Sequence, residues 1–374
     1  MVLENKRMED MSSNPLLKPD HIPLSNNYFL ALMRYRALWK TLKKNPENNK
    51  LYTEAIQKMK DEGEIEEVIE DNKTAKNVDG KNINYLPHHA VIKIDRVTTK
   101  CRPVFDGSAK NSEGNSLNDN LLPGPKRQLY IVKLLIKFRM NPVVVAADIS
   151  RLFNSVAIDS AYRDSYRFLW NEKEEEEPKI YRFKRLTMGT VDSPYLSIST
   201  VHHHLQQTAE KQPELKSVCE LIKDHLYVDD LLLAVASENK AIQFRREASK
   251  IFEEMKMKIQ KWCSNSSKVL KTIPQEERSP CENISDNNND GGEITFQDPD
   301  IITSQTKLLG MTWSPKHDTF HYNTYENLLE NKKIKYSKSG ISSIIPSIYD
   351  PTGILQPFTI RGKLILQKTW TYRN

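Results

Sequence analysis

Two neighbouring aspartates, Asp229 and Asp230, lie between apolar stretches in residues 221–236. Aspartate is common in turns, so an exposed turn without any chemistry is one interpretation of this pair. The apolar residues on both sides, however, predict a position close to a core, where two like charges are unfavourable unless a cation neutralises them. The pair is therefore a candidate site for a divalent cation.

A third carboxylate, Asp148, follows the continuously apolar residues 143–147, which predict a strand buried on both faces. Magnesium binds a few carboxylate oxygens and keeps its other positions for water or phosphate oxygens. We therefore expect Asp148 to complete a two-metal site with Asp229 and Asp230. Because aspartates at strand ends are also common caps and turn formers, a structural role is the alternative.

The segments before Asp148 predict a hairpin and a helix. Residues 85–104 contain β-branched and basic side chains, and Pro87 and Pro103 limit helix formation there, so a basic hairpin is expected. Residues 128–140 are amphipathic and end just before a proline, which predicts a helix that leads into the strand.

Three elements are expected between Asp148 and the aspartate pair. The first is a helix from Ser160, and the second is a hairpin in which residues 166–170 and 180–186 flank a solvated acidic loop. The third is a helix after Pro194. It contains three consecutive histidines, which point different ways on a helix and so predict an exposed polar stretch rather than a metal site: His202, His203 and His204.

The outer parts of the chain are more polar. Residues 1–84 show helical apolar spacing over residues 27–43 and 51–70. A charged amphipathic helix is expected over residues 239–257, and the composition of residues 264–305 predicts a flexible insertion. The last part predicts two helices and stops without a closing signal, so we expect the chain to be a fragment.

The composition is that of a globular protein, with 38% hydrophobic and 28% charged residues among 374. A formal charge of +6 is compatible with a polyanionic partner. The cysteines have no zinc-site spacing, which favours a reducing compartment. No run approaches the roughly 18 apolar residues of a membrane span, so no membrane attachment is expected.

Three motifs resemble those of reverse transcriptases. Tyr227-Val228-Asp229-Asp230 matches their Y-x-D-D motif, and Ala147-Asp148-Ile149-Ser150-Arg151-Leu152-Phe153 resembles their first metal-binding motif. Between the two, Met188-Gly189-Thr190-Val191-Asp192-Ser193-Pro194 is similar to the G-x-x-x-S-P segment that packs under the template and the incoming nucleotide. The motifs also occur in the family's order and spacing.

Further segments resemble the Bel/Pao class of long-terminal-repeat retrotransposons over about residues 20–374. They are Tyr85-Leu86-Pro87-His88-His89, Arg102-Pro103-Val104-Phe105-Asp106, Ser116-Leu117-Asn118-Asp119, Lys261-Trp262-Cys263-Ser264-Asn265 and Ser347-Ile348-Tyr349-Asp350-Pro351-Thr352-Gly353. The end of the chain also resembles what is described as a Pao retrotransposon peptidase region.

This resemblance implies an α+β right-hand polymerase fold with fingers, palm and the start of a thumb. We expect five parts, which are a helical extension (1–84), fingers and palm (85–265), a flexible insertion (266–305), a primer-grip hairpin (306–325) and truncated thumb-like helices (326–374).

The resemblance also implies roles for individual residues. Asp148, Asp229 and Asp230 are implied to be catalytic and to bind two Mg²⁺ ions, for which Mn²⁺ can substitute, with the backbone carbonyl of Ile149 as a further ligand. Lys261 aligns with a lysine that can act as the general acid for the leaving group.

Contacts to nucleotide and nucleic acid follow from the same resemblance. The residues implied to bind the incoming nucleotide are Lys93, Arg102, Phe153, Met188 and Gly189, with Phe153 as an aromatic gate against ribonucleotides. Those implied to contact template or primer are Ser193, Pro194, Tyr227, Val228, Leu309, Gly310 and Met311. Met188 stands where retroviral enzymes have glutamine, and Pro103 and Gly107 also differ from the usual residues of the class.

The implied function is RNA-directed DNA polymerisation by a retrotransposon enzyme that extends a DNA primer on an RNA or DNA template with deoxynucleoside triphosphates. RNase H and integrase segments of the same polyprotein are implied partners. The implied location is a cytoplasmic virus-like particle, with the nucleus as the alternative.

Two other functions stay open. One is a catalytically inactive or domesticated protein that keeps the fold and binds nucleic acid. The other is an aspartic peptidase, which needs paired D-T-G or D-S-G segments, whereas the nearest strings here are Asp106-Gly107-Ser108 and Val191-Asp192-Ser193.

Overall fold

The computed structural model describes residues 12–24, 26–69, 77–78, 81–93, 100–173, 176–279, 306–322, 339, 342 and 348–371. The chain forms two compact units, each built from segments that are far apart in the sequence. The first unit contains Met1–Arg127, Arg151–Lys211 and Glu253–Met257, and the second contains Gln128–Ser150, Gln212–Phe252 and Lys258–Asn374. Both units mix helices and strands, which confirms the predicted α+β class.

Two helices open the first unit, α1 (Tyr28–Leu42) and α2 (Pro46–Asp61). The prediction for α1 is confirmed, but α2 begins earlier and ends earlier than residues 51–70. Its start is set by Asn45, whose side chain accepts a hydrogen bond from the backbone N–H of Asn48. After the helix, Ile65–Glu67 forms strand β2 instead of a further helical turn, and it pairs with β10 (Lys179–Phe183).

The hairpin predicted around the acidic loop is confirmed, because β9 (Arg167–Trp170) pairs antiparallel with β10. The helix predicted from Ser160 is wrong. The chain forms the short 3₁₀ helix η3 (Arg163–Tyr166) there, and Asp164 accepts hydrogen bonds from Arg167 Nε at 2.9 Å and Arg182 Nη1 at 2.9 Å. Arg167 is a local partner three residues along the chain, whereas the ion pair with Arg182 holds the segment against β10.

The predicted basic hairpin is also confirmed as β5 (His88–Ile92) paired with β6 (Cys101–Phe105). Smaller elements of the unit are β1 (Ser12–Ser13), β3 (Asn77–Val78), β4 (Lys81–Asn82), α3 (Leu117–Asn120), η2 (Phe153–Ser155) and β8 (Ala157–Ile158). The helix predicted after Pro194 is α5 (Ser193–Lys211). The expectation of an exposed histidine stretch is wrong for His204, which is buried and hydrogen-bonded to Thr208.

Aromatic side chains form the core of the first unit. Trp170 stacks on Trp39 of α1 with ring centroids 5.6 Å apart and contacts Tyr52 of α2 edge-on at 5.2 Å. His88 is buried between Tyr52 and the carbonyl of Leu169, and burial lowers its pKa to about 4. The imidazole is therefore neutral and packs as part of the core. This aromatic core holds the two N-terminal helices against both hairpins.

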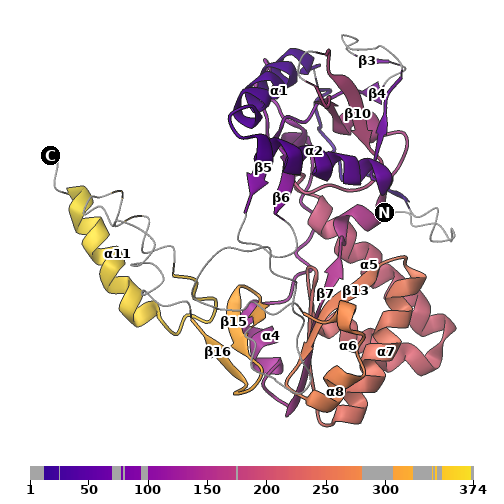
Figure 1. Ribbon diagram of the computed structural model, residues 1–374, viewed down its shortest axis with the longest axis vertical. Helices are drawn as coiled ribbons and strands as arrows, with labels where there is room; N and C mark the ends of the chain where they lie inside the picture. Colours follow the sequence, from indigo (N-terminus) through magenta and orange to yellow (C-terminus); the bar gives the residue numbers. More distant parts are fainter. Residues whose placement is uncertain are drawn as a thin grey trace. The chain divides into compact units, whose positions relative to one another are not determined.

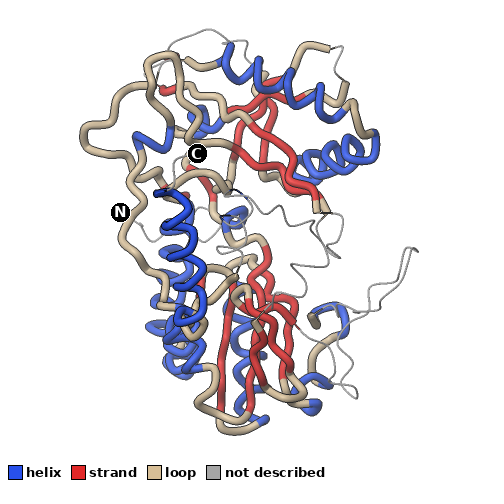
Figure 2. The backbone as a smooth tube through the Cα atoms, turned by 90° about the vertical axis from the view of Figure 1, so that its left-hand side faces the viewer, coloured by secondary structure: helices blue, strands red, loops and turns tan. Residues whose placement is uncertain are grey.

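A four-stranded sheet organises the second unit in the order β11 (Leu226–Tyr227), β12 (Asp230–Val235), β7 (Val143–Ser150) and β13 (Lys258–Ser264). Its long strands run side by side in Figure 2. Figure 1 shows α6 (Lys216–His225), α7 (Glu238–Glu254) and α8 (Ser267–Lys271) on one side of this sheet. On the other side lie α4 (Ile131–Lys137) and the small sheet of β14 (Thr306–Leu308), β15 (Met311–Ser314) and β16 (Thr319–His321).

One face of the central sheet contributes to a single buried cluster. Val144 and Ala146 of β7 and Leu232 of β12 pack there with Phe138 from the end of α4 and Trp313 of β15. Successive residues of a strand alternate between faces, so Asp148 and Asp230 continue this same face beyond the apolar cluster. The strand predicted for residues 143–147 is confirmed, and residues 144–147 are buried on both faces, whereas Val143 is half-buried.

The predicted insertion and the predicted C-terminal helices are each described in part. The first part of the predicted insertion is ordered, because α8 and the 3₁₀ helix η5 (Gln275–Glu277) lie within residues 264–279, whereas residues 280–305 lie outside the described residues. Of the two C-terminal helices expected, the second is α11 (Gln356–Thr371), and most of the first lies outside the described residues.

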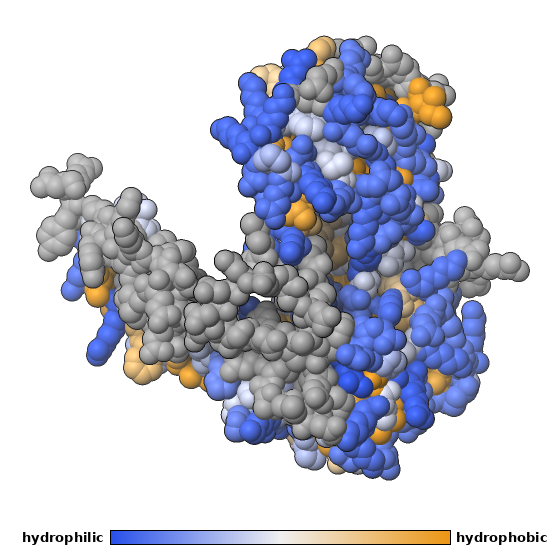
Figure 3. Space-filling view, in the orientation of Figure 1, coloured by the Kyte–Doolittle hydropathy of each residue, from blue (hydrophilic) through white to orange (hydrophobic). Residues whose placement is uncertain are grey.

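The surface agrees with the polar composition. Over the described residues on the face shown in Figure 3, hydrophilic side chains predominate on both units and apolar ones are scattered among them. Among the described helices, none is long and apolar enough to cross a membrane.

Candidate active site

Asp148 and Asp230 are directly opposite each other in the antiparallel pairing of β7 and β12. Residues in such a pair have Cβ atoms about 5 Å apart on the same face of the sheet. Asp148 lies inside β7, two residues before its end, rather than at the strand end that the sequence predicts. Two carboxylates at this separation repel each other, so the pair is destabilising without a cation.

Asp229 joins them through the turn between β11 and β12. Its carbonyl accepts a hydrogen bond of 2.7 Å from the backbone N–H of Ile149, which ties the turn to β7. Val228 precedes it with a φ of 56°, a left-handed conformation that is costly for a β-branched residue. The structure therefore brings the three predicted carboxylate residues together and does so through a strained turn.

Burial and charge act together on Asp230. Desolvation raises the pKa of its carboxyl group to about 7, and the neighbouring charges of Asp229 and Asp148 act in the same direction, whereas Lys261 opposes them. A carboxyl group that resists ionisation for these reasons is expected to ionise when a cation binds beside it.

The structure places the side chain of Lys261 beside this group of carboxylates. Its Nζ lies 2.6 Å from Oδ2 of Asp148, and the Lys261 and Asp148 side chains are 36% and 25% exposed. The lysine belongs to an irregularity of β13, because the register against β7 shifts between Gln260 and Cys263. The general-acid candidate from the sequence thus lies at the carboxylates, in contact with one of them.

The donor set fits a hard cation, although the described side chains are not arranged around one. Among the described residues, no group of three or more His, Cys, Asp or Glu side chains is positioned to hold a metal ion. The three carboxylates are nevertheless the oxygen ligands that magnesium prefers, and a divalent ion would offset the desolvation and the carboxylate repulsion that raise the pKa of Asp230.

The nucleotide-binding candidates all belong to the first unit. Lys93 and Arg102 are exposed on the β5–β6 hairpin, where Arg102 pairs with Val91. Phe153 begins η2 and is only 8% exposed, so most of its ring is buried. The turn that carries it is fixed by Arg151, which pairs with the buried Glu64 at 3.3 Å.

Met188 and Gly189 lie in the loop before α5. Met188 is 54% exposed, whereas Gly189 has a φ of 119° and its backbone faces that of β6 so closely that an added Cβ would lie 2.0 Å from the carbonyl oxygen of Phe105. Asn118 clamps this loop, donating to the carbonyl of Gly189 at 3.0 Å and accepting from the N–H of Val191 at 3.1 Å.

The pattern of residues around Asn118 does not predict this contact with the loop. Its sequence signal is the Ser116-Leu117-Asn118-Asp119 segment, which resembles the Bel/Pao class. Ser116 and Asp119 form a reciprocal capping box at α3, which fixes the helix that presents Asn118.

Ser193 and Pro194 form the first turn of α5. Ser193 is 1% exposed, and its hydroxyl bonds to the carbonyl of Thr187 at 2.9 Å and to the hydroxyl of Thr190 at 2.7 Å. These hydrogen bonds link the start of α5 to the loop before it, so the Ser193 hydroxyl stabilises the conformation of residues 187–193.

The primer-grip candidates lie at the β14–β15 turn of the second unit. Leu309 and Gly310 have φ values of 50° and 79°, and Leu309 and Met311 are buried in the core cluster against which Tyr227 packs. Tyr349 lies over Gly310, since an added Cβ there would be 2.9 Å from its ring. The turn is therefore held by Leu309 and Met311 in the core cluster and covered by the ring of Tyr349.

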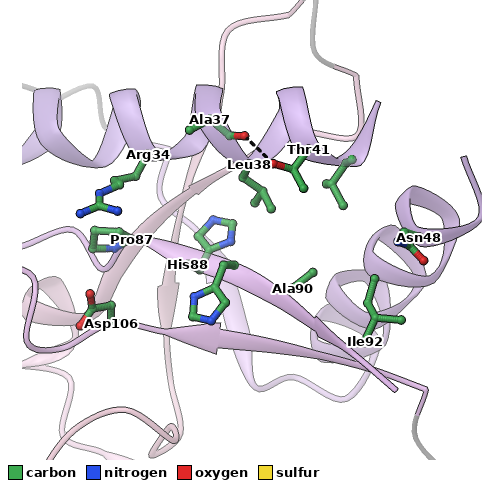
Figure 4. Close-up of a pocket in the computed structure, with 12 residues that line it drawn as sticks. Arg34, Ala37, Leu38, Thr41, Asn48, Pro87, His88, Ala90, Ile92 and Asp106 are labelled. Atoms are coloured by element: carbon green, nitrogen blue, oxygen red, sulfur yellow. Dashed lines mark hydrogen bonds between the residues drawn. The ribbon is translucent and has the colours of Figure 1, made fainter. Parts of the chain in front are cut away.

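A separate cavity of about 460 Å³ lies in the first unit between α1, α2 and the β5–β6 hairpin. Figure 4 shows Arg34 and Asp106 at one end of it and Asn48 and Ile92 at the other, with His88 in the middle. None of the predicted site residues lines it.

In each of the two strings considered for a peptidase, the aspartate accepts a hydrogen bond from a backbone N–H. Asp192 is fully buried and accepts a hydrogen bond from the N–H of Leu16 at 3.2 Å. Asp106 is exposed and accepts one from the N–H of Ser108 at 3.0 Å in its own turn. Each carboxylate holds local structure.

Comparison with known families identifies the class of protein that this sheet and its carboxylates define. The model of the reverse transcriptase (RNA-dependent DNA polymerase) family matches residues 74–311, which is more than half of the chain. The chain therefore belongs to the reverse transcriptase family.

A second match narrows this class. Residues 337–374 match the Pao retrotransposon-like RNaseH-like domain, so the reverse transcriptase is of the Pao retrotransposon type. The end of the chain, which in sequence resembles a Pao peptidase region, is thus matched by a family described as an RNaseH-like domain. No curated protein matches this chain.

Among solved structures, the prototype foamy virus protease-reverse transcriptase is similar to this chain at 16% sequence identity with a TM-score of 0.40. The aligned part covers 57% of this chain and 24% of that chain, so this chain spans about a quarter of that protein.

Proposed function

We propose that this chain extends a DNA primer on an RNA or DNA template by two-metal nucleotidyl transfer. The observation that carries the proposal is the register pair of Asp148 and Asp230, with Asp229 tied to the same strand by the Ile149 hydrogen bond. Membership of the reverse transcriptase family supports it. The alternative of an inactive nucleic-acid-binding protein is an outcome of the test below.

The aspartates would hold two Mg²⁺ or Mn²⁺ ions, with the carbonyl of Ile149 as a further ligand. Ions bound there would activate the primer 3′-hydroxyl and stabilise the pyrophosphate leaving group. The chain itself supplies the fixed geometry, since β7 and β12 hold two of the carboxylates in direct register.

Other residues would position the substrates. Arg102 and Lys93, exposed on one hairpin, suit the phosphates of a deoxynucleoside triphosphate. Lys261 would protonate the leaving group, and the β14–β15 turn with Leu309 and Gly310 would hold the primer end.

Further residues would contact the nucleotide, the template and the primer. Met188, Gly189 and Phe153 would line the nucleotide, and the template and primer contacts would come from Ser193, Pro194, Tyr227, Val228 and Met311. The proposed setting is a retrotransposon polyprotein with RNase H and integrase segments in a cytoplasmic particle, which the RNaseH-like match supports.

The test is primer extension on an oligo(dT)-primed poly(rA) template with magnesium, comparing the wild-type chain with Asp229→Asn. We expect the variant to lose nearly all extension while keeping its affinity for the primer-template, because the carboxylates bind metal whereas affinity comes from lysine and arginine contacts to phosphates. A wild-type chain with no more product than Asp229→Asn would favour the non-catalytic binding protein instead.

A further inference from the structure

Lys261 has a backbone conformation that a lysine seldom adopts. Its φ is 55°, in the left-handed region, at the register shift of β13 between Gln260 and Cys263. Irregularities of this kind redirect a side chain, and they persist only where the surrounding structure holds them. Here the neighbouring Trp262 and Cys263 are fully buried, so the strand is fixed on the C-terminal side of the lysine.

The redirected side chain reaches a carboxylate. Nζ of Lys261 lies 2.6 Å from Oδ2 of Asp148, and Gln260 is the register partner of the same aspartate. A charge-assisted hydrogen bond of this length between half-buried groups is stronger than a surface ion pair. It also neutralises part of the negative charge of three neighbouring aspartates.

We propose that Lys261 is an internal counter-cation of the active site, which binds Asp148 in the metal-free chain and must leave it when a divalent cation binds. The inference rests on the proposed function, because it requires Asp148 to be a metal ligand. Magnesium binds carboxylate oxygens at about 2.1 Å. An ammonium and a metal ion on one carboxylate oxygen would therefore be two cations a few ångströms apart, which repel each other.

This competition has a functional consequence. While Lys261 holds Asp148, a free metal ion gains less by binding, so the empty site takes up metal weakly. A nucleoside triphosphate that arrives with its own bound ion brings negative charge that the displaced ammonium can contact. Lys261 thereby couples metal uptake to the arrival of substrate, and it acts as a positioning residue for Asp148.

The experiment measures Mn²⁺ binding to the full chain, without nucleotide or nucleic acid, from the electron paramagnetic resonance signal of free Mn²⁺. Lys261→Met should bind Mn²⁺ at least about threefold more tightly than the wild type, since it loses a competitor worth about as much as a half-buried ion pair. Lys261→Arg, which keeps the charge, should stay within about twofold of the wild type. Lys258→Met is the matched control, because Lys258 lies on the same strand and is exposed.

Asp148→Asn separates the possible failures. Loss of Mn²⁺ binding in Asp148→Asn would show that Asp148 belongs to a metal site. If Lys261→Met then binds Mn²⁺ no more tightly than the wild type, the counter-cation role of Lys261 is overturned and the proposed function stands. An equal gain in Lys258→Met would also overturn it, since the effect would then be a general charge effect. Binding that Asp148→Asn leaves intact would overturn the metal site and the counter-cation together. Circular dichroism and thermal melting confirm that each variant is folded.

Discussion

A cross-strand pair of like charges is the residue-scale feature on which this site depends. Asp148 and Asp230 face each other in β7 and β12, and the burial of Asp230 together with this repulsion raises the pKa of its carboxyl group to about 7. The sequence predicts all three carboxylates, because paired aspartates among apolar residues are a local signal. The contact of Lys261 with Asp148 could not be predicted, since it depends on a register shift between strands 113 residues apart.

Phe153 offers a residue-scale prediction about substrate choice. If its ring is the gate beside the sugar, Phe153→Val should raise ribonucleotide incorporation relative to deoxynucleotide incorporation, while deoxynucleotide use stays within about tenfold. Because the side chain is 8% exposed, the change should also leave a cavity and cost about 1–3 kcal/mol of stability.

Incorporation of each nucleotide type and the melting temperatures of both proteins check this prediction. The gate assignment fails if the ratio of deoxynucleotide to ribonucleotide efficiency is the same in wild type and variant. A lower melting temperature with both substrates equally depressed would instead assign Phe153 to the core alone.

At the scale of elements, local patterns predict most of what the structure shows. The β5–β6 and β9–β10 hairpins and helix α5 follow from periodicity and from Pro and Asn punctuation in the sequence. The predictions of secondary structure are wrong where contacts with residues distant in the sequence determine the conformation. Residues 65–67 leave the predicted helix to pair with β10, and the segment after Ser160 is held by ion pairs to Arg182 instead of coiling into a helix.

The loop before α5 provides a prediction at this scale. Gly189→Ala should lower the melting temperature far more than Gly114→Ala, although both glycines have positive φ values, 119° and 82°. Only at Gly189 would the new Cβ meet a backbone atom, the carbonyl oxygen of Phe105 at 2.0 Å, whereas nothing lies within 4 Å at Gly114. Both positions share the conformational cost of about 1 kcal/mol for a left-handed residue.

Thermal melting of the two variants measures the difference. Similar losses of stability would mean that the loop moves away from β6 without cost, and the close approach of the two backbones would then have no structural importance.

The whole molecule is less predictable from sequence than its elements are. The chain passes between two compact units several times, and the periodicity of the sequence does not predict where it does so. Strand β7 belongs to one unit and the 3₁₀ helix η2 that follows it to the other, so the division falls between Ser150 and Arg151, within the segment that resembles the first motif of reverse transcriptases. Such a division depends on long-range packing, which periodicity and composition do not report.

The buried cysteines give this two-unit organisation a chemical reporter. Cys101 is in the first unit and Cys263 in the second, and burial raises the pKa of their thiols to about 11 and about 12. Both are therefore protonated at neutral pH and react with an alkylating reagent only when the surrounding structure opens.

Labelling rates would then time the opening of each unit. Cys263 lies on β13 two residues from Lys261, so Mg²⁺ bound at the carboxylates should slow its alkylation, while Cys101 should react at an unchanged rate. Mass spectrometry of the labelled peptides distinguishes the two thiols. If Mg²⁺ slows the alkylation of both thiols equally, the two units open in one cooperative step. Each thiol then reports the opening of the entire chain rather than of its own unit.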